Sequence, residues 1–254
     1  MAAVPAAMAQ ATGGCGGAVV VIVCGVSGCG KSTVGKGVAE RLRCPFYDAD
    51  DFHSSENIAK MASGGPLTDG DRWPWLDRLA AVVQQHASRD EPAVLACSAL
   101  KASYRAHLRA AAPPHQQSAV AMVLLDPPAA MLHAHLAARA AAAGTSPHFM
   151  PPSLLESQLE ALERPPAHGG SRYVCRHRPA AGGRQAEQGH GDCWELVECA
   201  ATTPVADPLL LHIEGQCCDL AGREAPCPHF PTAEECVHLV AAALRQVAGH
   251  LDCN

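Results

Sequence analysis

Apolar positions along this chain follow two different patterns. Residues 18–24 (AVVVIVC) form a continuous apolar run rich in β-branched side chains, which is typical of a strand buried on both faces of a parallel sheet. Residues 31–43 instead place Val34, Val38 and Leu42 on one face at helical spacing. By the same criteria we expect further strands at 45–48, 93–97, 119–126 and 208–215. Further helices are expected at 54–61, 71–88, 101–112, 128–143 and 151–163, with a last one starting near residue 232.

Strands that alternate with helices predict an α/β fold, in which a parallel sheet with right-handed crossovers lies between layers of helices. In such sheets, ligands gather at the carboxyl ends of the strands. A length of 254 residues suits one domain, which we place at 18–254.

Two segments depart from this rhythm. Residues 1–17 carry no charged side chain and match neither a secretory signal nor a transit peptide, so we expect a flexible tail. Residues 165–207 include a long stretch rich in glycine, proline and arginine with little periodicity. We expect this segment to be a disordered insertion within the domain.

Bulk composition narrows the class of protein. The hydrophobic content of 48% is enough for a core, and the charged content of 17% is too low for a disordered chain. A formal net charge of -6 argues against nucleic acid or an acidic membrane as a partner. No apolar run approaches the roughly 20 residues of a membrane-spanning helix, so we expect no such helix. Because residues 1–17 match neither a secretory signal nor a transit peptide, we expect a cytoplasmic protein by default. The 13 cysteines are scattered without a C-x-x-C pair, which favours reduced thiols over a metal site.

A phosphate-binding motif follows the first predicted strand. Gly25, Gly30, Lys31 and Ser32 satisfy the P-loop pattern G-x-x-x-x-G-K-[ST]. The glycines let backbone N–H groups turn toward phosphates, and the helix after them points its positive end at the same place. Lys31 is expected to reach the β- and γ-phosphates of ATP, and Ser32 to hold Mg²⁺. The residues expected to bind the nucleotide are Gly25, Val26, Ser27, Gly28, Cys29, Gly30, Lys31, Ser32 and Thr33.

Three aspartates stand at the end of the second predicted strand. Asp48 and Asp50 share one side of an extended chain, so both can face the cleft while Asp51 turns away. The functional interpretation is one carboxylate near Mg²⁺ and one near an acceptor hydroxyl, and a solvated acidic turn or helix cap is the plain alternative. Asp126, which closes another apolar strand, is a rival magnesium partner.

Four blocks of sequence resemble the gluconokinases, the small P-loop kinases that act on gluconate. The blocks read GVSGCGKSTVGKGVAERL, FYDADDFHSSENIAKMASGGPLTDGDRWPWL, CSALKASYRAHL and HFMPPSLLESQLEALE, and they occur in this order over most of residues 19–163. The resemblance implies ATP- and Mg²⁺-dependent phosphorylation of D-gluconate at O6, which gives 6-phospho-D-gluconate for the pentose phosphate pathway. It also implies a homodimer and a five-stranded parallel sheet of the nucleoside-monophosphate-kinase type.

The resemblance assigns catalytic roles that spacing alone does not. It implies that Asp50 is the partner of the attacking hydroxyl and that Asp48 lies closer to the metal. Arg139 resembles a lid arginine that neutralises charge on the transferring phosphoryl group, in a lid near 139–150.

The same blocks imply contacts to the substrate. Arg72 resembles a ligand for the gluconate carboxylate, with a surface ion pair to a neighbouring aspartate as the alternative. For Lys101 and Arg105 the alternative is a solvated helix face. The remaining candidates are His53 and His148, which could equally be structural histidines, and the weaker Lys60 and Gln158.

The chain departs from the family pattern in two places. The stretch AAAAGTSP between Arg139 and His148 is longer and more apolar than the usual link, which leaves open which arginine the lid delivers. The insertion at 165–207 falls near where this fold clamps adenine. Two alternatives to gluconate phosphorylation stay open: a kinase of the same fold for another small hydroxy acid such as shikimate, and a nucleotide-binding regulator that has lost turnover through its altered lid.

Overall fold

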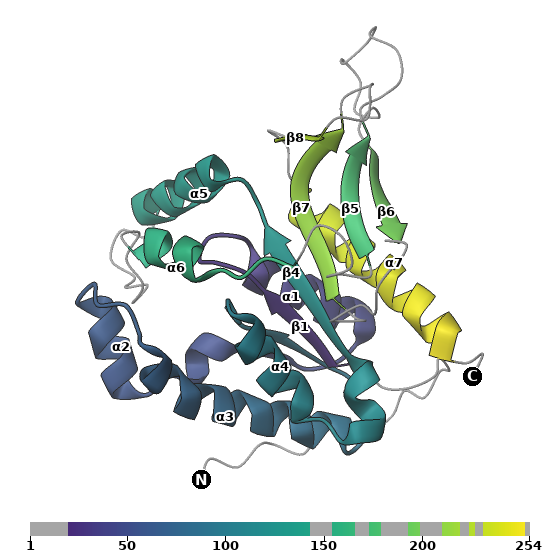
Figure 1. Cartoon of the computed structure of the whole chain (residues 1–254), viewed down its shortest axis with the longest axis horizontal. Helices are drawn as coiled ribbons and strands as arrows, with labels where there is room; N and C mark the ends of the chain where they lie inside the picture. The colour runs from purple at the N-terminus through teal and green to yellow at the C-terminus, as the bar shows by residue number, and fades with distance from the viewer. Residues whose placement is uncertain are drawn as a thin grey trace, which may run out of the picture.

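Five parallel strands form the main part of the sheet in the computed structural model, which describes residues 20–142, 154–165, 173–178, 193–198, 210–218, 224–226 and 231–251. The strands run in the order β2-β3-β1-β4-β7, and each neighbouring pair is parallel. This arrangement confirms the five-stranded parallel sheet expected from the sequence (Figure 1). Their bounds are β1 Val20–Cys24, β2 Phe46–Asp48, β3 Ala93–Ala96, β4 Val120–Asp126 and β7 Leu210–Cys218.

Helices cover both faces of this sheet. Helix α1 packs against β1, β3 and α7, whereas α3 packs against α4 and β1, and Figure 1 shows these two groups on opposite sides of the strands. The helices are α1 Lys31–Leu42, α2 Ser55–Ala62, α3 Asp69–Ala87, α4 Ala102–Ala110, α5 Ala129–Ala142, α6 Leu155–Ala161 and α7 Ala233–Leu251, with 3-10 turns η1 Ala49–Phe52 and η2 Pro114–Ala119. Of the helices that the structure describes, none is both long and apolar enough to cross a bilayer.

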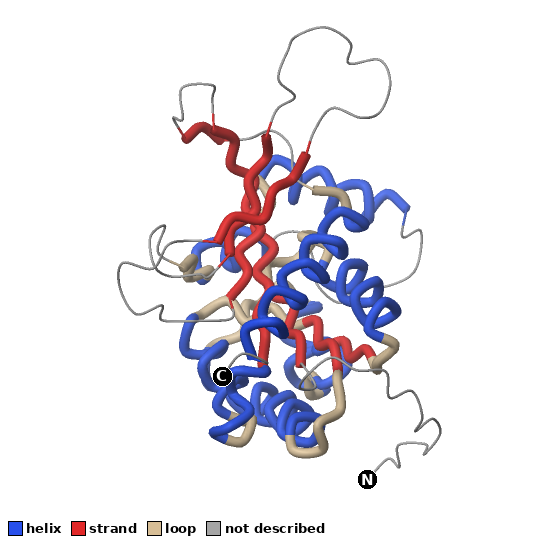
Figure 2. Tube along the Cα trace, turned by 90° about the vertical axis from the view of Figure 1, so that its right-hand side faces the viewer, coloured by secondary structure: helices blue, strands red, loops and turns tan. Residues whose placement is uncertain are grey.

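The sheet continues beyond β7, where the sequence did not predict strands. Strand β5 (Tyr173–Arg178) pairs parallel to β7, and β6 (Cys193–Glu198) pairs antiparallel to β5. Strand β8 (Glu224–Pro226) pairs antiparallel to the end of β7. The segment 165–207, expected to be a disordered insertion, therefore contributes two strands to an eight-stranded sheet, seen as the red column in Figure 2.

The core lies between the central strands and the helices on either side. Every residue of β1, β3 and β4 is buried, as a strand covered on both faces requires. Among the largest side chains in this core are Trp75, Leu76, Leu79, Tyr104 and Leu132, which come from α3, α4 and α5. Packing on both faces fixes the carboxyl ends of the strands, where the site described below is built.

Local capping sets where two helices begin. Helix α3 starts at Asp69, two residues earlier than expected, because Thr68 and Asp71 form a reciprocal capping box. The last helix, which we expected to start near residue 232, also begins with a capping box: Glu235 N–H donates to Thr232 Oγ1 at 3.3 Å, and Thr232 N–H donates to a Glu235 carboxylate oxygen at 2.7 Å.

Candidate active site

The loop after β1 has the backbone of a phosphate cradle. Gly25, Gly28 and Gly30 have φ angles of 137°, 85° and 95°, which other residues rarely adopt. At Gly25 a side chain is excluded as well, because a Cβ atom would lie 2.5 Å from the Leu125 carbonyl oxygen and 2.7 Å from Cys29 Sγ. Helix α1 begins at Lys31 directly after the loop, so its N-terminal N–H groups and positive dipole end face the same space.

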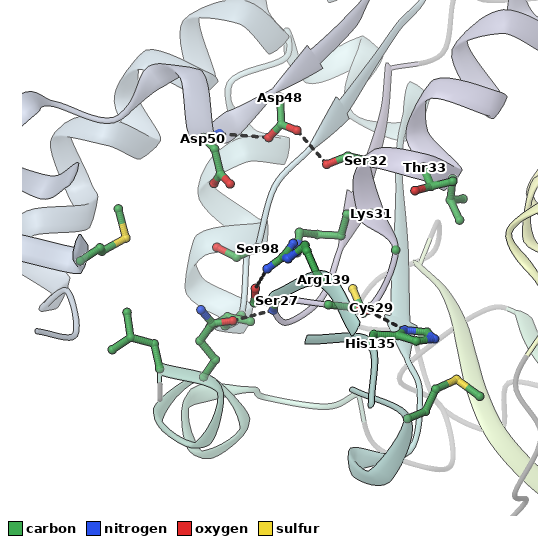
Figure 3. Close-up of a pocket in the computed structure, with 18 of the residues that line it drawn as sticks. Ser27, Cys29, Lys31, Ser32, Thr33, Asp48, Asp50, Ser98, His135 and Arg139 are labelled. Carbon is green, nitrogen blue, oxygen red and sulfur yellow. Dashed lines mark hydrogen bonds between the residues drawn. The ribbon is translucent and has the colours of Figure 1, made fainter. Parts of the chain in front are cut away.

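The two aspartates expected to face the cleft do so. Ser32 Oγ donates to Asp48 Oδ2 at 2.7 Å, and the Asp50 N–H donates to Asp48 Oδ1 at 3.2 Å. Asp48 therefore caps η1 as well as contacting the P-loop serine, so the plain alternative of a helix cap holds alongside the position next to Ser32. Asp48 and Asp50 line the same cavity (Figure 3). Asp51 is exposed and does not line it.

A cavity of about 580 Å³ opens along the phosphate loop. Its walls come from the loop and the start of α1, from η1, α2 and α3, from α5 and α6, and from the start of α7. Of the expected site residues, the cavity is lined by Ser27, Gly28, Cys29, Gly30, Lys31, Ser32, Thr33, Asp48, Asp50, His53, Arg72, Arg139 and Gln158. Gly25 and Val26, at the start of the loop, are buried and do not line the cavity.

Arg72, His53 and Trp75 all line the cavity. Arg72 lines the cavity, and its Nη1 lies 3.9 Å from Asp69 Oδ1, so the ion pair considered as the alternative is present but long. The His53 ring stacks on Trp75 with 4.5 Å between ring centroids. Burial, followed by the positive charges of the nearby Arg78 and Arg72, lowers the pKa of His53 to about 4. His53 is therefore neutral at pH 7 and available as a hydrogen-bonding group rather than as a cation.

The helices on either side of the expected lid contact the phosphate loop. Arg139 Nη2 on α5 donates to Ser27 Oγ at 3.3 Å, and the Ser27 N–H donates to Gln158 Oε1 on α6 at 2.7 Å. His135, also on α5, lies with Nδ1 3.1 Å from the Gly28 carbonyl oxygen, as Figure 3 shows. His148 lies outside the described residues.

Three expected substrate contacts are not brought to the cavity. Lys60 donates to Asp71 Oδ2 at 2.6 Å, and Lys101 donates to both carboxylate oxygens of Asp69 at 2.9 and 2.8 Å. Arg105 is buried, not solvated, and its guanidinium donates to the carbonyl oxygens of residues 99, 100 and 163. These side chains hold α2, α3 and α4 in place around the cavity wall.

Asp126, the alternative magnesium partner, contacts other side chains. Asp126 accepts hydrogen bonds from Arg164 Nε and Nη2 at 2.7 and 3.0 Å, and His212 Nε2 lies 3.3 Å away. Burial works to raise the pKa of Asp126, but the hydrogen bonds from His212 and Arg164 together outweigh burial and lower the pKa. Asp126 does not line the cavity, so the geometry favours Asp48 as the carboxylate nearest a metal on Ser32.

Several lining residues had no sequence signal. His135 stands in no sequence motif, yet its Nδ1 lies 3.1 Å from the Gly28 carbonyl oxygen of the phosphate loop. Pro231, Thr232, Ala233 and Cys236 close the far side of the cavity from the start of α7, about 200 residues beyond the loop in sequence. Only the three-dimensional packing of α7 against α1 could place them there.

The donor set fits magnesium on a P-loop. Mg²⁺ usually takes one or two protein oxygens and completes its shell with phosphate and water. Ser32 Oγ and the Asp48 carboxylate supply such oxygens at the cavity wall. Within the part of the chain that the structure describes, no cluster of three or more His, Cys, Asp or Glu side chains could hold an ion by itself. This result agrees with a magnesium site that takes its other ligands from the nucleotide.

This fold and site define a P-loop kinase: a parallel sheet, a phosphate cradle after β1 and an acidic pair after β2. A family model described as "AAA domain" matches residues 20–165. The chain is 42% identical over 149 residues to a "Gluconokinase" of Arabidopsis thaliana, covering 57% of this chain and 77% of that protein. It is 43% identical over 146 residues to the "Thermosensitive gluconokinase" of Escherichia coli (strain K12), covering 58% of this chain and 72% of that protein.

A solved structure supports the same assignment over almost the whole chain. The crystal structure of a gluconokinase from Sinorhizobium meliloti 1021 matches with a TM-score of 0.58 at 33% identity, covering 92% of this chain and 95% of that one. The chain belongs to the gluconokinase family.

Proposed function

We propose that the protein is a gluconokinase that transfers the γ-phosphoryl group of ATP to the 6-hydroxyl of D-gluconate. The observation that carries this proposal is one cavity that brings Lys31, Asp50 and Arg72 together beside the phosphate loop. The relatives named as gluconokinases support the substrate. They do not favour the two alternatives, a shikimate-type kinase and a regulator without turnover.

The roles follow from charge and position. Arg72 offers a guanidinium that can bind the gluconate carboxylate bidentately, which fixes the far end of the acid. Asp50, which lines the same cavity, would orient the 6-hydroxyl and accept its proton as the oxygen attacks phosphorus. The new O–P bond forms as the bond from phosphorus to the β–γ bridging oxygen breaks, and ADP leaves with that oxygen. Lys31 and Arg139 place positive charge where the transferred group passes.

Ser32 and Asp48 would hold Mg²⁺ at this site. When bound, Mg²⁺ would neutralise phosphate charge during transfer. Ser32 Oγ would be its direct protein ligand, and the Asp48 carboxylate, 2.7 Å from that hydroxyl, would orient it. The homodimer and the cytoplasmic location expected from the sequence stay predictions.

A coupled assay of ADP release tests the substrate. Purified protein is given ATP and Mg²⁺ with D-gluconate, shikimate or a nucleoside monophosphate. We expect turnover with D-gluconate and background rates with the others. Equal rates on shikimate would contradict the assigned specificity, and no turnover with any acid would favour the regulator.

A further inference from the structure

Two side chains, one from α5 and one from α6, meet on one residue of the phosphate loop. Arg139 binds the Ser27 hydroxyl, and Gln158 accepts from the Ser27 N–H at 2.7 Å. Gln158 lines the cavity. Because the residue is only 9% exposed, water competes little for its hydrogen bond to Ser27. The contact joins α6 to the loop across 131 positions of sequence.

The peptide group between Val26 and Ser27 is held at both of its polar ends. The Val26 carbonyl oxygen accepts from Lys31 Nζ at 2.8 Å, while the Ser27 N–H donates to Gln158. This peptide is trans and planar, so its C=O and N–H point to opposite sides, and one rotation of the group would disturb both bonds. Hydrogen bonds in a chain also polarise one another, so donation by the N–H makes the carbonyl a better acceptor. Gln158 is thereby linked to the phosphate-loop lysine through a single peptide group.

We propose that Gln158 is a positioning residue of the phosphate loop, and not a ligand of gluconate as the family resemblance implies. Gln158 orients the peptide group 26–27 and, through that group, Lys31 for nucleotide binding. The inference rests on the proposed function of this site. Its main readout is nucleotide binding in the absence of gluconate, so it can fail or hold independently of the acid that the enzyme phosphorylates.

The chemistry of the position explains why a neutral acceptor stands there. A glutamate would accept the same hydrogen bond but would add negative charge to the wall of a cavity that receives a polyphosphate. A leucine would keep much of the volume and remove the acceptor. These two substitutions therefore separate the hydrogen bond from the charge.

The test compares Gln158→Leu, Gln158→Glu and the matched control Gln85→Leu, which changes an exposed glutamine on α3. ADP affinity is measured by calorimetry without gluconate, together with Tm and the KM for gluconate. We expect Gln158→Leu to weaken ADP binding about 3- to 10-fold, the range that one hydrogen bond contributes. Gln158→Glu should weaken ADP binding more, the KM for gluconate should not change in Gln158→Leu, and Gln85→Leu should match the wild type.

A double-mutant cycle tests the link to the lysine. In a Lys31→Ala background, Gln158→Leu should weaken ADP binding by less than 2-fold, because the residue through which it acts is gone. Fully additive losses would overturn the coupling. A raised KM for gluconate with unchanged ADP affinity would overturn the proposal in favour of a substrate contact. A lowered Tm with unchanged ADP affinity per folded molecule would reduce Gln158 to a structural residue.

Discussion

The hydroxyl of Ser32, which follows the phosphate-loop lysine, donates a 2.7 Å hydrogen bond to Asp48 at the end of β2. This bond joins the end of β2 to the start of α1, although β2 and β1 are separated in the sheet by β3. It explains why negative charge stands so soon after a phosphate cradle: one carboxylate serves the serine, and the next one, on Asp50, faces the same cavity.

Asp48→Asn should raise the requirement for magnesium. A neutral amide in place of the carboxylate weakens the orientation of Ser32, and such changes next to a metal ligand typically cost about 10- to 100-fold in metal affinity. Turnover at low Mg²⁺ should fall by a similar factor and return in part as Mg²⁺ is raised, because mass action refills a weakened site. A magnesium titration of turnover measures this. Loss of turnover that no magnesium concentration relieves would remove Asp48 from the metal site.

Asp50→Asn should lower kcat with little change in the magnesium requirement. The substitution keeps shape but removes the base, and general-base catalysis contributes roughly 10²- to 10⁴-fold. Asp51→Asn is the matched control, since Asp51 is exposed and outside the cavity, and it should retain near wild-type turnover. If the two variants lose similar activity, Asp50 is not the partner of the hydroxyl.

Asp126→Asn should destabilise the protein and leave turnover per folded molecule nearly intact. The change leaves the Arg164 guanidinium and His212 facing an uncharged amide, and breaking a buried ion pair costs about 3–5 kcal/mol. Because Arg164 is partly exposed, we expect the lower end of that range or less. Urea denaturation at pH 7 checks the stability. Magnesium rescue of this variant, without rescue of Asp48→Asn, would move the metal site to β4.

His53 should make the protein less stable as the pH falls from about 6.5 toward 4. The folded pKa of about 4 lies below the usual value of 6.5, so the unfolded chain binds the extra proton first. The stability due to neutral His53 is thus fully present above pH 6.5 and is lost as the pH falls through the folded pKa. His53→Phe keeps an aromatic ring against Trp75 and cannot titrate. The difference in unfolding free energy between variant and wild type should therefore change across this window; a constant difference would contradict the assignment.

Local sequence predicted the central sheet and the cradle because their signals are local. The apolar run of β1, the glycines and the helix after them lie within 25 residues, and Asp48 and Asp50 follow a strand of the same kind. Strands β5 and β6 were missed because a stretch rich in glycine, proline and arginine surrounds them and their pairing with β7 is set by partners distant in sequence.

Side-chain roles were harder to predict, because they depend on distant partners. Arg105 stands in a block shared with kinases, yet the carbonyl oxygen of Glu163, 58 positions away, helps to occupy its guanidinium. Asp126 ends a strand, as a metal ligand would. Its carboxylate instead contacts Arg164 and His212, which lie 38 and 86 positions away in sequence. The contacts of Arg105 and of Asp126 could not be predicted from the spacing of residues in the sequence.

The pairing of β7 restricts how two copies of this chain can associate. Strand β7 has β4 on one side through Glu214, β8 further along at Gln216–Cys218, and β5 on its opposite side. The last strand of the five-stranded parallel sheet is therefore an interior strand, with its backbone donors and acceptors already used. Among the described strands, the outer positions of the sheet order belong to β2 and β6. Strand β8 likewise pairs with β7 on one side only. A homodimer that extended the sheet from one subunit into the next would therefore have to join at β2, β6 or β8.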